Sequence, residues 1–561
     1  MRGLNPTRGD LVADARRTFL QVFALTLVLK LGLAAWLPMT GDEAFFYQWG
    51  VRPAWGYSDH PPMVGWLIWL LRHLGDSPLA LRSATVLLTS VIALGVVDLA
   101  RRLLPPGREA SAWLAGAVYL ALPFSWLFVL VTTDTPLIFF MTASCWCFVR
   151  AELAGSAPAA GAGEVGRSAG GAAGWYAASG ALLGLAFLSK YFAVLVGLGY
   201  AVWLLGWRRE RAWALVLIVV CALPGAAVNL AFNATHGWPN IMFNVFNRNQ
   251  GTRWSASDFV VYLVMMVYLL TPWLVWQALR AQRGGRHPAR AGGAGLGAAD
   301  IAPPPGAEVT TEASGMPPPG SRLVWVLWAA PFLLFALVAT RRSVGLHWVL
   351  GFVPLFVLWA GLRLSPQALR RSLHWTGWLA LPHALLLVAL LAAPLAWWQR
   401  SSQFASVVFL REAPAIAAAL QKDLPPGAGL MARAYSPAAV LAFHAGRYVP
   451  VFGVGRFHAR QDDQWVDFGT LDGQALRIYD RKPFDEAEFA PYFKHLRTGS
   501  FEVAGLRMHY LDGEGFRFQP YRDQLLQQAA DRFHRVPPWL PILGSPFCER
   551  YGFASCSPGR P

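Results

Sequence analysis

Charged residues are scarce in this chain. Only 14% of its 561 residues are Asp, Glu, Lys or Arg, whereas 55% are hydrophobic and the mean hydropathy is +0.37. A soluble protein of this size cannot bury so much apolar surface, which excludes a soluble globular fold. The net charge of +16 comes from Lys and Arg residues in short runs between apolar stretches, such as "RRLLPPGR" and "WRRERAW". This positive-inside pattern is typical of membrane proteins and excludes nucleic acid as a partner.

Several motifs are also missing. The sequence has no G-x-x-x-x-G-K-[ST] loop for a nucleotide and no Asp-x-Asp element for a metal-bound nucleotide sugar. It has no internal repeat of the kind that many transporters show. Cysteines number five, and three lie in apolar runs. The other two, Cys548 and Cys556, lie in the polar C-terminal region, where an oxidising compartment would allow a disulfide.

Long apolar runs predict a mainly α fold, a polytopic bundle of about eleven membrane-spanning helices, since a span needs about 20 apolar residues. The predicted spans are 18–38, 81–100, 111–131, 136–152, 174–189, 191–207, 213–232, 257–279, 322–340, 348–364 and 375–397. Arg16 and Arg17 precede the first span, so we expect a cytoplasmic amino terminus and a retained first helix. Two Ala/Gly/Pro-rich stretches, 154–174 and 284–320, are predicted to be disordered cytoplasmic linkers.

The first outer loop contains a further helical pattern. The stretch 61–75, "PPMVGWLIWLLRHLG", begins with two prolines and ends at Gly75. A helix of this length reaches only about 20 Å, too short to cross the hydrocarbon core. It is predicted to lie along the outer interface, with a re-entrant hairpin as the alternative.

The composition changes near residue 400. We predict a transmembrane domain over 1–400 and a soluble α/β domain over 401–561. Because an odd number of predicted spans follows a cytoplasmic amino terminus, the second domain is expected on the outer, periplasmic side. Within the second domain, "QALRIYD" predicts a strand, and "LRMHYLDGEGFRF" predicts two strands joined by an Asp-Gly turn.

Ionisable residues gather on the outer side of the predicted topology. They come from five segments, the first two of which lie in the same connection: "GDEAFF", "GYSDHPP", "TTDTP", "LSKY" and "RRSVGLHW". Such groups near a bilayer are costly and usually have a partner or a function. The candidate residues are Asp42, Glu43, Asp59, His60, Asp134, Lys190, Arg341, Arg342 and His347.

These residue types suit transfer of a sugar from a polyprenyl phosphate. The leaving phosphate needs no strong general acid, so the site requires a carboxylate near the acceptor and cations near the phosphate. Asp42 or Glu43 is the candidate for the first role, and Lys190 with Arg341 or Arg342 for the second. The remaining candidates, the two histidines among them, are expected to bind sugar or phosphate.

Each assignment has a structural alternative. For a lone acidic pair at a helix start, capping the helix or pairing with Arg52 is the commoner role, and the other polar residues on the same side favour the functional role for Asp42 and Glu43. Asp134 precedes Pro136 and is as much a candidate N-cap as a substrate contact. Lys190 suits a snorkelling position at a helix end.

The order of the motifs resembles a known family. "DEA", "GYSDHPP", "TDTP", "LSKY" and "NATHGW" follow one another as in bacterial members of the GT-C superfamily of integral-membrane glycosyltransferases. The branch is the one related to protein mannosyltransferases and to the aminoarabinose transferase of lipid A. The resemblance covers about 18–400 and implies a polyprenyl-phosphate-linked donor, inversion at the anomeric carbon, and a catalytic acidic residue that matches Asp42, often with a divalent metal ion nearby.

The chain also departs from that pattern. Phe45 and Phe46 stand where aminoarabinose transferases usually have an arginine, which disfavours lipid A as the acceptor. Beyond residue 400 the family varies, and "GRFHARQDDQW" at 455–465 is the richest polar segment there.

Together these observations predict a glycosyltransferase of the bacterial inner membrane. It would move a sugar from a polyprenyl-phosphate donor to a lipid, glycan or protein acceptor at the outer face. Asp42 or Glu43 is the candidate ligand for a divalent metal ion, and membrane lipids are the surroundings. The alternative is a transporter or flippase for a lipid-linked or anionic solute, although polar residues at one face favour surface chemistry over transit.

Overall fold

The computed structural model describes residues 7–127, 129–154, 162–247, 253–284 and 320–556. The chain forms two compact units. The first unit comprises residues 1–26, 92–125 and 256–381, and the second comprises 27–91, 126–255 and 382–561. The predicted boundary at residue 400 follows composition and stays a prediction.

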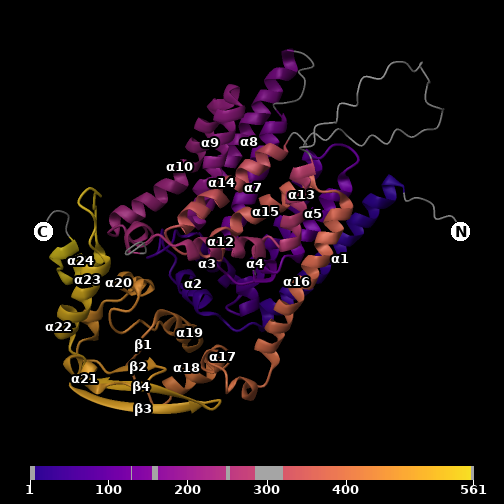
Figure 1. The fold of residues 1–561 in the computed structure, drawn as a ribbon. Coiled ribbons are helices and arrows are strands. Elements are labelled where there is room, and N and C mark those ends of the chain that lie inside the picture. Colours follow the sequence, from indigo (N-terminus) through magenta and orange to yellow (C-terminus); the bar gives the residue numbers. More distant parts are fainter. Residues whose placement is uncertain (1–6, 128, 155–161, 248–252, 285–319, 557–561) are drawn as a thin grey trace, which may run out of the picture. The chain divides into compact units, whose positions relative to one another are not determined.

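The first unit is helical (Figure 1). Its core is α15, which packs against α5 and α14, and Gly361 of α15 lies so close to Ala115 of α5 that an added Cβ would stand 2.6 Å from the alanine Cβ. The long helices α1, α4 and α16 each run through both units. The helices that lie wholly or partly in the first unit are α1 Arg8–Trp36, α4 Pro78–Leu103, α5 Glu109–Ala121, α12 Ala256–Leu269, α13 Pro272–Gly284, α14 Ser321–Ala339, α15 Val353–Arg363 and α16 Pro366–Ala392.

The predicted span 257–279 is not one straight helix. It consists of α12 and α13, which meet at an angle of 90°. Pro272 opens α13, and Thr271 before it has a φ of 61°. Proline has no backbone N–H and disfavours helical geometry in the residue before it, so the helix breaks here.

The part of the second unit that precedes residue 256 carries a bundle in which α7 and α10 both pack on α8 (Figure 1). The α8–α10 contact depends on small residues: a Cβ at Gly180 would lie 2.3 Å from the carbonyl oxygen of Ile218. Small residues at such crossings let helix backbones approach closely in membranes. The helices are α2 Gly41–Val51, α3 Met63–Leu71, α6 Phe124–Leu127, α7 Asp134–Ala154, α8 Ala162–Ser189, α9 Val194–Trp207, α10 Ala212–Thr235 and α11 Pro239–Ile241.

Two sequence predictions about this bundle have clear outcomes. The helix predicted over 61–75 is present as α3 followed by a 3-10 turn, Arg72–Leu74, and it ends at Gly75 with a φ of 125°, whereas its place at the interface stays a prediction. The predicted disordered linker 154–174 is wrong in its second half, because α8 begins at Ala162. Alanine favours helix, and these alanines extend the following span backwards. The linker at 284–320 lies almost entirely outside the described residues.

The last part of the second unit is built around a mixed four-stranded sheet of order β1-β2-β4-β3 (Figure 1). β1 and β2 are parallel, and the other two pairs are antiparallel. The strands are β1 Gly429–Ala432, β2 Leu476–Asp480, β3 His495–Val503 and β4 Leu506–Glu514. The helices are α17 Phe404–Arg411, α18 Ala413–Gln421, α19 Tyr435–Ala445, α20 Arg460–Trp465, α21 Glu486–Phe489, α22 Phe518–Tyr521, α23 Gln527–Phe533 and α24 Pro546–Tyr551.

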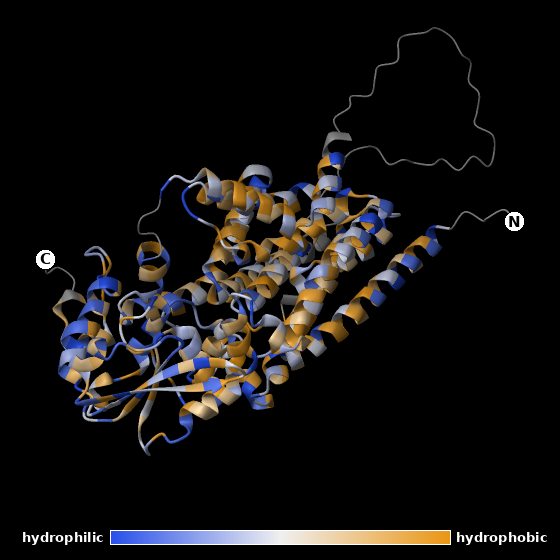
Figure 2. Ribbon diagram, turned by 60° about the horizontal axis from the view of Figure 1, so that its bottom comes forward, coloured by the Kyte–Doolittle hydropathy of each residue, from blue (hydrophilic) through white to orange (hydrophobic). Residues whose placement is uncertain are grey.

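Both faces of this sheet are covered. Tyr479 belongs to an apolar cluster shared with α17, α18 and α19, and its neighbour Ile478 belongs to a second cluster shared with α23 and α24. Alternate residues of a strand point to opposite faces, so each strand contributes side chains to both apolar clusters. Figure 2 shows the corresponding mixture of polar and apolar colour along the strands, whereas the long helices are mainly hydrophobic.

The predicted strand at "QALRIYD" is confirmed as β2, but the predicted Asp-Gly hairpin is wrong. Asp512 and Gly513 lie inside β4, paired with β2 and β3. The turn falls instead at Ala504 and Gly505, whose φ angles are 51° and 78°. A ring at Phe493 occupies the space beside Gly513, where a Cβ would lie 2.3 Å from it. Tertiary packing therefore keeps that glycine in the strand.

Among the described residues, seven helices are long and apolar enough to cross a membrane: α1, α4, α7, α8, α10, α14 and α16. Up to nine spans result if each of two bent helix pairs is one span. Every one of the eleven predicted apolar segments contains helix, although α5, α9 and α15 are short. The chain is a mainly α, multi-pass membrane protein with a small α/β region after α16.

Candidate active site at the start of α2

The start of α2 is fixed by Glu43. Its carboxylate accepts hydrogen bonds from the backbone N–H of Thr40, which caps the helix, and from that of Val131 at 3.0 Å. Arg82 of α4 donates to both carboxylate oxygens, at 2.8 and 2.7 Å, and neither side chain is more than 2% exposed. The capping alternative is therefore correct for Glu43, although its ion-pair partner is Arg82 and not Arg52.

Arg52 has a different place. Its guanidinium lies over the rings of Tyr448 and Trp465, 4.5 and 5.2 Å from their centroids. These are cation–π contacts between Arg52, which follows α2, and two rings of the C-terminal region, one after α19 and one at the end of α20.

Asp42 is the exposed member of the acidic pair. It lies in the first turn of α2, where the helix dipole favours negative charge. The hydroxyl of Tyr435, the first residue of α19, donates to Asp42 Oδ1 at 3.2 Å. Asp42 thus combines a fixed backbone with an accessible carboxylate, whereas both oxygens of Glu43 are engaged.

Asp59 is buried, 2% exposed, between two histidines. Its Oδ2 lies 3.1 Å from His60 Nδ1 and 3.0 Å from His458 Nδ1. Burial raises the pKa of Asp59, but the charge of His60 and the hydrogen bond from His458 outweigh it and hold the pKa well below its usual range. The Asp59 carboxylate is therefore ionised, and its Oδ1 has no hydrogen-bond partner among the described residues.

The loop that carries Asp59 is held by amide side chains. Gln461 of α20 accepts from the Ser58 backbone N–H at 2.9 Å, and Asn240 donates to the carbonyl of Tyr57. The Tyr191 hydroxyl donates to Asn240 Oδ1 at 2.8 Å. The "LSKY" and "GYSDHPP" motifs, over 130 residues apart in sequence, are thus connected through one asparagine side chain.

Asp134 and Lys190 form a second pair. Lys190 Nζ donates to Asp134 Oδ1 at 2.8 Å, and both side chains are about 10% exposed or less. Lys190 stands in the break between α8 and the 3-10 turn Tyr191–Ala193. The two residues were predicted separately, and the fold brings them together as a buried ion pair.

The other predicted cations lie in the first unit. Arg341 and His347 are exposed, and Arg342 is half-buried with its guanidinium 5.2 Å from the centre of the Trp348 ring. They occupy the turn after α14. Their part in the site stays a prediction.

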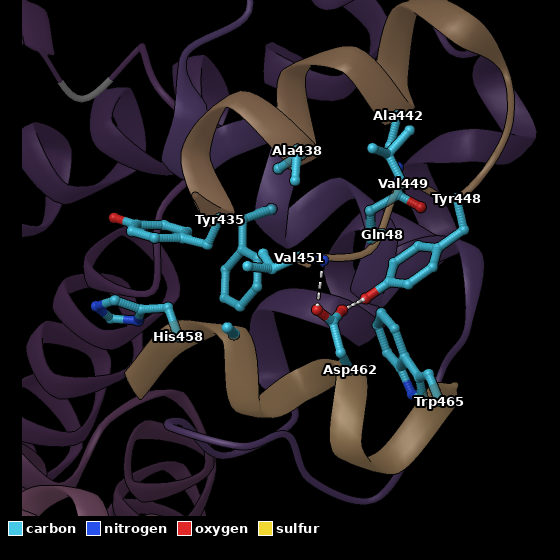
Figure 3. Close-up of a pocket in the computed structure, with 13 residues that line it drawn as sticks. Gln48, Tyr435, Ala438, Ala442, Tyr448, Val449, Val451, His458, Asp462 and Trp465 are labelled. Carbon is cyan, nitrogen blue, oxygen red and sulfur yellow. Dashed lines mark hydrogen bonds between the residues drawn. The ribbon is translucent and has the colours of Figure 1, made fainter. Parts of the chain in front are cut away.

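A small pocket lies beside the Asp59 cluster (Figure 3). Its walls include Tyr435, His458 and the α20 residue Asp462, and its volume of about 20 Å³ holds about one water molecule. Asp462 accepts from the Tyr448 hydroxyl and from the Val451 N–H, at 2.8 Å for the latter. Burial nevertheless raises the pKa of Asp462 to about 7.

Sequence reasoning missed several of these residues. Segment 455–465 stood out as polar, and it supplies His458 and Gln461. Arg82 and Tyr435 carried no sequence signal, because one is an ordinary arginine of an apolar helix and the other a single tyrosine.

The sequence predicts Asp42 or Glu43 as the ligand of a divalent metal ion, and the two residues differ in whether their carboxylates are accessible to one. The described residues contain no group of three or more His, Cys, Asp or Glu side chains that could hold a metal ion. Glu43 does not fit, since Arg82 engages both of its oxygens. Asp42 fits a different arrangement, in which Mg²⁺ takes one protein carboxylate, several waters and a substrate phosphate.

The fold and the site together define a multi-pass membrane protein with buried ion pairs and an exposed carboxylate, that of Asp42, at the start of α2. Two solved structures share this fold, both of ArnT from Cupriavidus metallidurans. The apo form has a TM-score of 0.56 at 17% identity, and the form bound to undecaprenyl phosphate has 0.58 at 16%. Each match covers 88% of this chain and 97% of that chain.

Sequence comparisons agree with the predicted resemblance. Residues 59–163 match the family described as dolichyl-phosphate-mannose-protein mannosyltransferase. A curated relative, the lipid A galacturonosyltransferase RgtD of Rhizobium johnstonii, is 25% identical over 266 residues, 44% of this chain. The match spans about half the length of that relative, 51%. None of these comparisons supports the transporter alternative.

Proposed function

We propose that the protein is an inverting glycosyltransferase that moves a sugar from a polyprenyl-phosphate donor to an acceptor at the outer face of the bacterial inner membrane. The observation that carries the proposal is the exposed Asp42 at a rigid helix start, beside the buried Asp59 cluster, on the fold of ArnT. One ArnT structure contains undecaprenyl phosphate, the chemical class of donor that the motifs predict.

In the proposed reaction, the acceptor hydroxyl attacks the anomeric carbon from the face opposite the phosphate. A bond forms between the acceptor oxygen and that carbon while the carbon–phosphate oxygen bond breaks. The hydroxyl proton passes to Asp42, and the polyprenyl phosphate leaves as a monoester. Attack from the opposite face inverts the anomeric configuration.

The cations would stabilise the phosphate. Asp134 fixes the ammonium group of Lys190 at the end of the helix bundle. The same ammonium group would also bind a donor phosphate nearby. Arg341, Arg342 and His347 are proposed as further phosphate contacts, and Asp59 with His60 as contacts to the sugar. As an alternative to its role as the base, the Asp42 carboxylate would hold a Mg²⁺ ion, which would supply positive charge near the donor phosphate.

Two observations support the proposed placement in the membrane. Helix α7 has the Asp134–Lys190 pair at its first residue and, 18 residues later, Glu152 paired with Arg208 and Arg211. At 1.5 Å per residue these ends are about 27 Å apart, close to the thickness of a hydrocarbon core. The disulfide between Cys548 and Cys556 suits an oxidising periplasm around the C-terminal region.

The acceptor is proposed to be a lipid, a glycan or a protein. RgtD, by its name, acts on lipid A, so lipid A is the first acceptor to test, despite the departures at Phe45 and Phe46. The test offers purified protein a panel of undecaprenyl-phosphate monosaccharides, with and without lipid A, and follows donor consumption by mass spectrometry. We expect one donor to be consumed with release of undecaprenyl phosphate. Consumption of no donor with any lipid, glycan or peptide acceptor would contradict the proposal.

A further inference from the structure

We propose that Tyr435 and His458, which lie beyond the membrane-spanning helices in sequence, are positioning residues for Asp42 and Asp59. This inference rests on the proposed function, since it assigns the polar region after α16 a part in the same site. The C-terminal region would then complete the active site of the first outer loop.

The two segments are joined by a close interface between α2 and α19. A Cβ at Gly41 would lie 1.9 Å from Ser436 Oγ, so the first turn of α2 fits against α19 only because residue 41 is glycine. The ring of Phe45 packs on Tyr435, and that of Tyr47 packs on Phe443, with centroids 5.6 and 4.8 Å apart. The backbone around Asp42 is therefore fixed relative to Tyr435.

Tyr435 then orients the carboxylate of Asp42. Its hydroxyl donates to Oδ1, while the side chain of Asp42 is exposed. Burial, followed by the charge of Asp42 and its hydrogen bond, raises the pKa of Tyr435 above its ordinary value, so the hydroxyl keeps its proton and acts as a donor. Binding one oxygen in this way leaves the other to take a proton from an acceptor hydroxyl.

His458 links Tyr435 to Asp59. Its ring packs against that of Tyr435, with centroids 4.5 Å apart, and its Nδ1 lies 3.0 Å from Asp59 Oδ2 (Figure 3 shows the two rings side by side). His458 also contacts the ring of Phe243, which follows α11. One side chain thus fixes the tyrosine and the buried carboxylate together.

The test compares Tyr435→Phe with Tyr47→Phe, a matched control from the same α2–α19 interface whose hydroxyl faces Arg72 and Asp76 instead of Asp42. The reaction is turnover of the undecaprenyl-phosphate sugar that the wild type consumes. We expect Tyr435→Phe to lower kcat about tenfold, as for loss of one hydrogen bond to a charged group, with the donor KM and the melting temperature unchanged. Tyr47→Phe should keep wild-type kcat.

His458 is tested in the same assay with two replacements. Asparagine places an N–H donor near the position of Nδ1, whereas leucine does not. We expect His458→Leu to lower kcat and His458→Asn to restore at least half of the lost activity. Equal loss in both variants, or a kcat for Tyr435→Phe equal to that of Tyr47→Phe, would overturn the inference.

A second readout separates this inference from the proposed function. With 3-fluorotyrosine at position 435, the ¹⁹F resonance should shift on Asp42→Asn and stay unchanged on Asp76→Asn. If the wild type consumes none of the offered donors, the function fails, but a shift specific to Asp42 still supports the positioning contact. Absence of that shift overturns the inference whatever the activity.

Discussion

Arg82 and Glu43 form a buried bidentate ion pair in which both carboxylate oxygens accept hydrogen bonds from one guanidinium. Arg82 also donates to the carbonyls of Ala34, Leu37 and Pro38, so it connects the end of α1 to the start of α2. This relationship separates the roles of two neighbouring acidic residues. Glu43 fixes the helix start, and Asp42 is left accessible.

The first prediction follows from this division. Glu43→Ala leaves Arg82 buried without its counter-ion, which should cost about 3–5 kcal/mol of stability. Asp42→Ala, at an exposed position in the same turn, should cost less than about 1 kcal/mol. Thermal unfolding of the two variants in detergent measures the difference, and a double Glu43→Met, Arg82→Met variant should recover much of the loss. Equal melting temperatures for the two alanine variants would contradict the structural role of Glu43.

The second prediction concerns catalysis. Asp42→Asn should abolish transfer from the donor, at least about a hundredfold in kcat, because an amide cannot accept the acceptor proton. The variant should insert into the membrane and melt like the wild type, since Asp42 is exposed and its contact to Tyr435 is a single hydrogen bond. Turnover near the wild-type rate would show that Asp42 is not the base.

The third prediction concerns the Asp134–Lys190 pair. Lys190→Ala should weaken use of the donor more than use of the acceptor, because the ammonium is proposed to face the phosphate. It should also destabilise the fold by leaving Asp134 buried and unpaired. The double variant Asp134→Ala, Lys190→Ala should therefore lose less stability than the sum of the losses in the two single variants. Steady-state kinetics with each substrate varied, together with melting curves, test both parts. Equal effects on donor and acceptor would argue against a phosphate contact.

The fourth prediction is a pH dependence of stability. The pKa of Asp462 rises from 3.8 to about 7 on folding because of burial, so the folded protein binds more protons than the unfolded chain between these values. The contribution of Asp462 to the free energy of unfolding is greatest at low pH. It falls by about 1.4 kcal/mol per pH unit as the pH rises between the two pKa values. Asp462→Asn removes the titration and adds only a constant offset. The melting temperature of the wild type should therefore fall relative to the variant from pH 4.5 to pH 7.5, and a constant difference would disprove the shift.

Several features could be predicted from the sequence because their signals are local. Apolar runs placed the helices, prolines and Gly75 bounded α3, and five short motifs in order indicated the fold of a membrane glycosyltransferase. Other features had misleading local signals. Asp512 and Gly513 form a favourable turn pair, yet pairing of β4 with two strands and the ring of Phe493 keep them extended.

The sequence by itself determined that the chain crosses a membrane and which connections between helices carry charge, because both depend on composition over short windows. Only the tertiary structure decided which charges meet. It paired Glu43 with Arg82 and Asp134 with Lys190, and it brought Tyr435 and His458 to two carboxylates nearly 400 residues earlier in the chain. The physical reason is that a buried ion must find its counter-ion through packing, and packing joins segments that no local sequence pattern relates.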